Sequence, residues 1–220
     1  MSKVKLTWAT PNAEALIVEM ARVSAPKNKG NMETAPKLLR YLINHKHWSP
    51  FEMANMCLEI NTTRAISPQV LRHRSFSYQE FSQRYADTNE LGSAVIPHLR
   101  RQDNKNRQNS TDDLAEKIGK EKLAEFYRRT SVLYEESEHL HKEMISAGVA
   151  KECARGVLPL NTQTSLYMNG TLRSWIHYIQ LRCDPGTQFE HREIAEAARR
   201  IFCDQFPIIG EAAFQTKAPG

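Results

Sequence analysis

The sequence predicts an α+β fold in which helices pack on a small, mainly antiparallel sheet, and three observations support this class. Several stretches carry apolar residues at helical spacing, two others resemble strands, and the two kinds interleave along the chain. The chain has 220 residues, of which 40% are hydrophobic, so it can bury one sizeable core. Residues 1–220 are therefore expected to form a single domain.

Two helices are predicted within the first 50 residues. Thr10 followed by Pro11 favours a helix start, because proline is well tolerated in the first helical turn. The stretch 27–31 is polar and contains glycine, so a loop is expected there. A second helix is predicted to begin near residues 34–36 and to end at 45–50, where the sequence reads HKHWSP.

A strand and a short helix are predicted to follow. Apolar side chains alternate from Ala54 to Ile60, and a period of two is typical of a strand with one buried face. Ser67 is expected to cap a helix whose first residue is Pro68 and which continues to Leu71.

The second half of the chain begins with a polar stretch at 102–113, the best candidate for a mobile surface loop. A long helix is expected from there to about Ala147, and Gly148 is expected to end it. A strand is predicted at 162–168, followed by a turn at Asn169–Gly170.

Two further helices are expected to complete the fold. Thr171 can cap the first of them, which places Arg173 and His177 on one face because they are four residues apart. Thr187 and Glu190 have the spacing of a capping box for a last helix that ends at Phe206.

Composition limits the class of partner. Lys and Arg total 30 against 25 Asp and Glu, a net charge of +5 that suits an anionic ligand but is too small to indicate nucleic-acid binding. The four cysteines are far apart and H-E-x-x-H is absent, so no metal site is expected. With neither a signal peptide nor 18 consecutive apolar residues, a cytoplasmic protein without a membrane span is expected, in the host cytoplasm if the source is a virus.

The densest group of functional side chains lies in QVLRHRSFSYQEFSQRY, residues 69–85. Guanidinium groups bind phosphate through paired hydrogen bonds, and serine hydroxyls can complete the contacts to a bound anion. This segment contains four basic side chains and one carboxylate: Arg72, His73, Arg74 and Arg84 are basic, and Glu80 is acidic. Charge alone therefore predicts either a phosphate site or a solvated basic turn.

The spacing within this segment is more specific than its charge. It fits R-H-R-x-x-S-x-x-x-x-S-x-R with six fixed positions: Arg72, His73, Arg74, Ser77, Ser82 and Arg84. This pattern resembles the motif of the flavin-dependent thymidylate synthases. The resemblance extends through 45–52, 154–159 and 169–182, and so covers most of the chain.

The resemblance implies reductive methylation of dUMP to dTMP. In that family methylenetetrahydrofolate supplies the carbon, and NADPH reduces FAD, which then supplies hydride. The family forms homotetramers whose active sites lie between subunits. The implied partners are thus dUMP, folate, NADPH and further copies of the chain, with neither nucleic acid nor membrane. No G-x-G-x-x-G occurs, which fits a flavin site assembled from separate segments.

The resemblance also assigns roles to individual residues. The implied flavin contacts are Ser49, Arg72, His73, Arg74, Glu80, Thr171, Leu172, Arg173 and His177. The implied nucleotide contacts are Gln69, Val70, Leu71, Arg72, Glu80, Phe81, Ser82, Gln83, Arg84, Arg155 and Arg182. The family often has histidine where this chain has Met53, so no role follows for that side chain.

Arg182 is the implied catalytic residue. Its family role is to stabilise the ionised uracil ring, and a permanently charged donor lowers the cost of negative charge on a pyrimidine. The alternative interpretation is an arginine that only complements the C-terminus of its helix.

Two other classes of function stay open at this point. Arg-His-Arg resembles the R-H-G of histidine phosphatases, which would make His73 a covalent nucleophile in a phosphohydrolase. A basic nucleic-acid-binding module would instead bind RNA or DNA in a salt-sensitive manner and without flavin.

Overall fold

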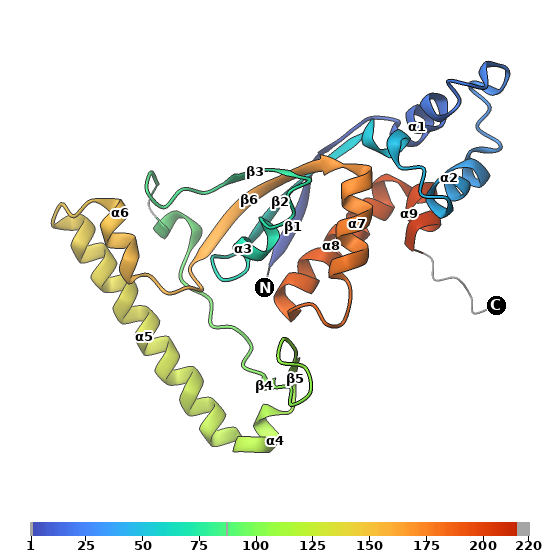
Figure 1. Cartoon of the computed structure of the whole chain (residues 1–220). Helices are drawn as coiled ribbons and strands as arrows, with labels where there is room; N and C mark the ends of the chain where they lie inside the picture. Colours follow the sequence, from blue (N-terminus) through green and yellow to red (C-terminus); the bar gives the residue numbers. More distant parts are fainter. Residues whose placement is uncertain (1, 87, 215–220) are drawn as a thin grey trace.

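The computed structural model describes residues 2–86 and 88–214 and has an antiparallel sheet at its centre (Figure 1). Four strands pair in the order β1-β2-β6-β3, each antiparallel to its neighbour: β1 (Lys3–Ala9), β2 (Asn55–Thr63), β6 (Gln163–Thr171) and β3 (Ser77–Glu80). The predicted α+β class is confirmed, whereas the division into domains stays a prediction.

Helices precede, interrupt and follow the strands along the chain. In chain order they are α1 (Ala13–Ala21), α2 (Ala35–Asn44), α3 (Ser67–Val70), α4 (Leu114–Ile118), α5 (Lys120–Ser146), α6 (Lys151–Ala154), α7 (Leu172–Arg182), α8 (Phe189–Gln205) and α9 (Pro207–Phe214). In Figure 1, α7 and α8 lie beside the sheet, whereas α5 extends away from it as a long arm. None of the helices in the described part of the chain has the length and apolar character that crossing a bilayer requires.

The core lies between the sheet and α7–α8. Alternate residues of β6 are buried, and this pattern orients one face of the sheet towards the helices. The fully buried Trp175 of α7 donates from its indole Nε1 to the carbonyl oxygen of Met56, 2.8 Å away on β2. The opposite face is more open, since Trp8 and Tyr167 keep 45% and 43% of their surface exposed.

Asn169–Gly170 is part of a strand, and the predicted turn there is wrong. Asn169 pairs with Cys57 on one side and with Ser77 on the other, so β6 runs without interruption into α7. A Cβ on Gly170 would stand 2.4 Å from Cδ1 of Phe76. The glycine therefore permits the close approach of an aromatic ring and does not form a turn.

Substituting Gly170 tests this packing. Gly170→Ala is expected to lower the free energy of unfolding by about 1–3 kcal/mol, because the added methyl overpacks a buried ring. Gly156→Ala is the matched control, since a Cβ there meets nothing within 4 Å. Urea unfolding of both variants checks the prediction, and equal stabilities would contradict it.

Three predicted helix starts are wrong in detail. The first helix begins at Ala13, after Asn12 with a φ of 51°, and not at Thr10–Pro11. Ser67 is itself the first residue of α3 and does not cap it. The predicted capping box of α8 is absent, because Gln188 and not Thr187 is the N-cap, and Glu190 forms an ion pair with Arg100 at 2.7 Å. Four elements, β1, β3, α6 and α9, were not predicted from the sequence.

The stretch predicted as a mobile surface loop forms a hairpin of β4 (Arg101–Gln102) and β5 (Ser110–Thr111). The carboxylate of Asp103 organises its turn by accepting hydrogen bonds from two backbone N–H groups and from the side chain of Asn109. The single predicted helix that follows is two, α4 and α5, because Gly119 has a φ of 84° between them. Gly148 ends α5 as predicted.

Candidate active site

The C-terminal end of α7 brings Arg182 into contact with the Arg-His-Arg triplet, 109 residues earlier in the chain. The guanidinium Nε donates to Nε2 of His73 at 2.9 Å. Because a guanidinium can only donate, this ring nitrogen must be unprotonated. Burial and the charge of Arg182 lower the pKa of His73 to about 4. His73 is therefore neutral near pH 7 and its Nε2 is already engaged.

A tyrosine side chain holds the backbone around the triplet through its hydroxyl group. The hydroxyl of Tyr78 on β3 shares its single hydrogen between the carbonyl oxygens of Val70 (2.8 Å) and His73 (3.0 Å). Arg72 and Arg74 flank His73 with exposed side chains, and neither forms an ion pair within residues 2–86 and 88–214. Two guanidinium groups are therefore presented to solvent beside a neutral histidine.

The residues predicted to bind nucleotide occupy two places in the chain. Gln69 lies near the triplet and donates from Nε2 to Oε1 of Gln188 at 2.6 Å. Glu80 lies at the end of β3, where Arg64 forms an ion pair with it at 2.7 Å. The Thr164 hydroxyl also donates to Glu80, 3.0 Å away. Glu80 is thus held in the sheet and not against the triplet.

The second part of the nucleotide segment leads towards α6. Phe81, Ser82 and Gln83 follow β3 directly, and the Phe81 N–H donates to the Ser165 carbonyl at 2.9 Å. Arg84 forms an exposed ion pair with Glu152 of α6 at 2.9 Å. Arg155 follows at the start of the short helix Arg155–Val157 and is exposed. Arg84 and Arg155 therefore mark one basic region beside α6.

The predicted flavin residues of the α7 segment gather at its N-terminus. Thr171 caps the helix as predicted, accepting from the Ser174 N–H at 3.2 Å. Arg173 forms an ion pair with Glu52, the last residue of the short helix Ser49–Glu52. His177 shares the face of Arg173 and lies edge-on to Trp48 at 4.7 Å between ring centroids. Burial and the charge of Arg173 lower the pKa of His177.

Three residues that are predicted to contact ligands have buried or half-buried side chains. Val70 and Leu172 are fully buried, and the Leu172 N–H already donates to the Ala54 carbonyl at 2.9 Å. Leu71 is half-buried just after α3. Hydrophobic burial thus accounts for Val70 and Leu172, and their assignment as ligand contacts stays a prediction.

Within this chain, the residues predicted to bind flavin and nucleotide form separate groups. Arg173 and Arg182 stand near opposite ends of α7, about 14 Å apart at the usual rise of an α-helix. The group around Arg84 and Arg155 lies on α6 and its neighbours. The side chains implied to hold one flavin and one nucleotide are therefore distributed over the surface.

Three residues around the triplet and Arg182 were not predicted from the sequence. The rings of Tyr178 and His191 lie 4.8 and 6.1 Å from that of His73, and Gln188 accepts a hydrogen bond from Gln69. Tyr178 precedes Arg182 by four residues, so helical spacing alone could have placed it on the same face of α7. Gln188 and His191 come from the other side of the α7–α8 turn, and no local pattern indicates their position.

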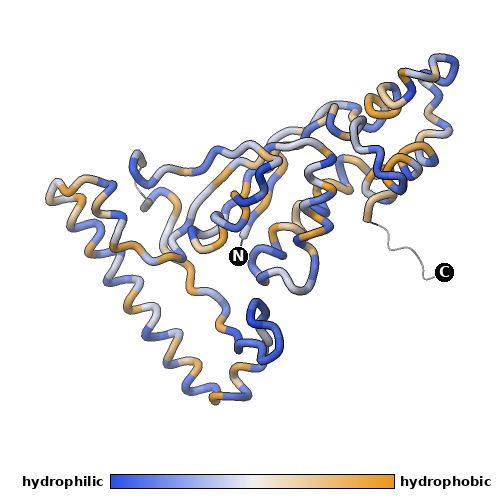
Figure 2. The backbone as a smooth tube through the Cα atoms, in the orientation of Figure 1, coloured by the Kyte–Doolittle hydropathy of each residue, from blue (hydrophilic) through white to orange (hydrophobic). Residues whose placement is uncertain are grey.

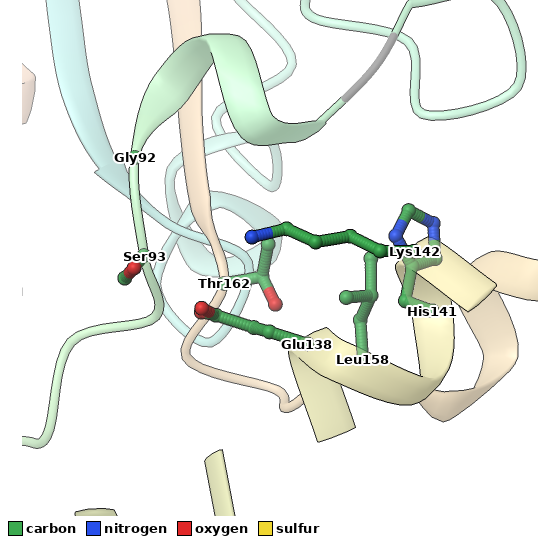
Figure 3. A pocket seen from close by; sticks show the side chains of 7 residues that line it. All are labelled: Gly92, Ser93, Glu138, His141, Lys142, Leu158 and Thr162. Carbon is green, nitrogen blue, oxygen red and sulfur yellow. The ribbon is translucent and has the colours of Figure 1, made fainter. Parts of the chain in front are cut away.

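Two hollows in the described structure lie outside the triplet. The first, of about 210 Å³, lies between α5 and the Gly92–Ser93 segment, and Figure 3 shows Glu138 and Lys142 at its edge. The second, of about 310 Å³, lies beside Gln188 and Phe189. Both are at or below the lower limit of pockets that hold small ligands. Among the described residues, no group of three or more His, Cys, Asp or Glu side chains is placed to bind a metal.

His191 makes stability depend on pH. It is fully buried, and burial together with the charges of Arg182 and His73 lowers its pKa to about 3. In the unfolded chain histidine takes up a proton below about pH 6.5, whereas the native side chain does not. Stability is therefore complete above that pH and is lost as the pH falls towards 3, by about 2 kcal/mol at about pH 5.

The comparison of the wild-type protein with His191→Gln, which cannot titrate, checks this dependence. Urea unfolding at fixed protein concentration, at about pH 7.5 and pH 5, should show a smaller loss of stability on acidification in the variant. Equal losses in both proteins would contradict the assignment to His191.

Comparisons with known proteins identify the family. The model of the family described as "Thymidylate synthase complementing protein" matches residues 5–208. The flavin-dependent thymidylate synthase of Synechocystis sp. is 53% identical over 199 residues, which cover 90% of this chain and 88% of that protein. The probable flavin-dependent thymidylate synthase of Paramecium bursaria Chlorella virus 1 is 51% identical over 91% of this chain and 90% of that protein.

A solved structure shows the same fold. The UMP/dUMP methylase PolB from Streptomyces cacaoi, bound with 5-Br dUMP, superimposes with a TM-score of 0.82 at 24% identity, covering 96% of this chain and 94% of that chain. The family match spans every segment that carries the predicted site, from Ser49 to Arg182. On this evidence, the chain belongs to the family of flavin-dependent thymidylate synthases.

Proposed function

We propose that this chain catalyses the reductive methylation of dUMP to dTMP, with methylenetetrahydrofolate as carbon donor and NADPH-reduced FAD as hydride source. The observation that carries the proposal, within the family, is the contact between Arg182 and His73. It joins the arginine expected to activate the base to the triplet expected to hold the flavin.

The exposed donors fit an anionic flavin. Arg72 and Arg74 can donate paired hydrogen bonds to phosphate, and the N-terminus of α7 near Thr171–Arg173 favours negative charge. Ser49, His73 and His177 would complete the contacts. When bound there, FAD supplies the hydride that this chain's own side chains cannot provide.

The chain is expected to bind the nucleotide both at its phosphate and at its sugar or base. Ser82, Arg84 and Arg155 can bind the phosphate, where their charge and hydroxyl suit a dianion. Gln69 offers directional hydrogen bonds to the sugar or base. Binding the phosphate at a distance from the reacting ring orients the pyrimidine for the chemical step.

Arg182 is suited to activate the base. Its Nε is engaged by His73, which leaves the two terminal nitrogens to form a forked pair of hydrogen bonds to a uracil carbonyl and ring nitrogen. Neutral His73 fixes the guanidinium plane without adding a second positive charge. The guanidinium charge then offsets the negative charge that develops on the ring.

The same contact argues against a phosphohydrolase. A histidine nucleophile needs an unprotonated ring nitrogen free to attack phosphorus. In neutral His73, Nε2 accepts from Arg182 at 2.9 Å, and Nδ1 therefore carries the ring hydrogen. The family match likewise accounts for the basic triplet without a nucleic-acid partner.

The active unit is proposed to be a homotetramer with active sites between subunits. Of the 27 residues of α5, only His141 is buried, although the helix carries an apolar stripe with a period of seven. Its members Phe126, Leu133 and Leu140 are 38%, 67% and 45% exposed. Figure 2 shows hydrophobic positions recurring along the long helix that Figure 1 labels α5, which stands apart from the sheet. Further copies of the chain would cover the stripe and bring the separate groups of site residues together.

Colour and NADPH consumption test the proposed function. The purified chain should bind FAD, become yellow and oxidise NADPH in the presence of dUMP. A protein that neither binds added FAD nor forms dTMP from dUMP and methylenetetrahydrofolate would contradict the proposal.

A further inference from the structure

A buried polar pair lies behind His73, on the side where α7 meets α8. His191, in the first turn of α8, is fully buried, and Tyr178 of α7 is 1% exposed. Nε2 of His191 and the Tyr178 hydroxyl are 3.2 Å apart and share a hydrogen bond. Nδ1 of His191 is buried and has no hydrogen-bond partner within the described residues.

This pair is polar, whereas the core side chains next to it on α7 and α8 are apolar. An imidazole with one unpaired nitrogen costs free energy to bury, and two apolar side chains of similar shape would avoid that cost. The neighbouring core positions are indeed apolar, including Ile194 and Ile179. Packing alone therefore gives no reason for a histidine and a tyrosine here.

The pair is connected to the proposed catalytic arginine through aromatic contacts. The Tyr178 ring lies edge-on to the His73 ring, with centroids 4.8 Å apart and planes at 86°. The His191 ring lies 6.1 Å from that of His73. His73 in turn accepts from Arg182, which is on the same face of α7 as Tyr178. The contacts thus run from His191 through Tyr178 and His73 to Arg182.

We propose that Tyr178 and His191 are positioning residues that fix the His73 ring and, through it, the direction in which Arg182 donates. The proposal rests on the role of Arg182 in activating the base. The His191 hydrogen bond fixes the Tyr178 ring, whose edge contact restricts the His73 ring to the orientation that points Nε2 at Arg182. Loss of this restraint lets the guanidinium turn, so the chemical step slows while phosphate binding by Arg84 and Arg155 is unaffected.

Two amide substitutions of His191 form a matched test. The amide nitrogen of glutamine lies where Nε2 of histidine does, so His191→Gln keeps the hydrogen bond to Tyr178. The amide nitrogen of asparagine lies where Nδ1 does, a position without a partner, so His191→Asn loses it. Tyr178→Phe removes the same bond from the other side and keeps the aromatic ring.

Steady-state kinetics of the flavin-loaded enzyme give the readout. His191→Asn and Tyr178→Phe should lower kcat for dTMP formation about tenfold and leave KM for dUMP within about twofold, whereas His191→Gln should keep kcat near the wild-type value. Wild-type kcat in both His191→Asn and Tyr178→Phe, or an equal loss in His191→Gln, overturns the proposal. Thermal unfolding of each variant establishes whether it is folded at the assay temperature. If His191→Asn is unfolded there, the kcat of Tyr178→Phe alone tests the proposal.

Arg182→Ala separates this inference from the proposed function. If Arg182→Ala forms dTMP as fast as the wild-type enzyme, the role of Arg182 is wrong, and the positioning proposal fails with it. If Arg182→Ala is slow but His191→Asn and Tyr178→Phe are not, only the positioning proposal is wrong.

Discussion

Replacing Arg182 by alanine is expected to lower kcat for dTMP formation about 100- to 1,000-fold, the usual cost of losing a charged donor aimed at a developing negative charge. KM for dUMP should change little, because the phosphate is expected to be bound by Ser82, Arg84 and Arg155. The variant also frees Nε2 of His73 and removes a positive charge beside it, so the pKa of His73 should rise. Steady-state kinetics with saturating methylenetetrahydrofolate and NADPH measure both constants.

Two further arginine variants control this result. Arg182→Lys keeps the charge but loses the planar fork, so it should recover only part of kcat. Arg200→Ala removes an exposed arginine of α8 and should leave kcat unchanged. An undiminished kcat in Arg182→Ala would show that the arginine serves the helix terminus and not the base.

Replacing Leu133 by glutamate is expected to dissociate the assembly and reduce dTMP formation to background. Leu133 is the most exposed member of the α5 stripe, so the change should be tolerated in the isolated protomer. In an assembled interface it would bury a charge without a partner, which is strongly unfavourable. Light scattering coupled to size exclusion measures the mass, and flavin absorbance measures cofactor binding.

Arg128→Glu is the control for charge. Arg128 lies about 140° around the same helix from Leu133, away from the apolar stripe, and is exposed. This variant should keep the wild-type mass and activity. A Leu133→Glu protein of unchanged mass and full activity would contradict the assembly proposed through α5.

Local chemistry made α7 the most predictable element. Thr171 caps it, and Arg173 and His177 share its accessible face while Trp175 and Ile176 are buried. Each of these features depends on residues within one or two turns of one another, so one stretch of sequence contains the information.

Features set by tertiary contacts could not be predicted in this way. Asn169–Gly170 has the composition of a turn, but pairing on both sides and the ring of Phe76 make it a strand. The capping box at Thr187 and Glu190 was wrong because the N-cap is Gln188, and the carboxylate of Glu190 pairs with the distant Arg100. In both cases partners far along the chain outweigh the local preference.

The candidate site shows the same limit. The charge of 69–85 predicted either a phosphate site or a solvated basic turn, and only the family resemblance connected this segment with Arg182. The structure then placed these two segments in contact through His73. The hydrogen bond between Tyr178 and His191 could not be predicted, because it depends on the conformation of the turn between α7 and α8. The sequence of that turn does not indicate this conformation.

A single turnover of the reduced enzyme tests the central claim most directly. The FAD-loaded protein is reduced with NADPH without oxygen, freed of excess NADPH, and mixed with dUMP and methylenetetrahydrofolate while flavin absorbance and dTMP are followed. The proposed reaction predicts one dTMP for each flavin oxidised, and none when either substrate is left out. Flavin oxidation without dTMP, or dTMP formed equally well by protein stripped of flavin, would contradict it.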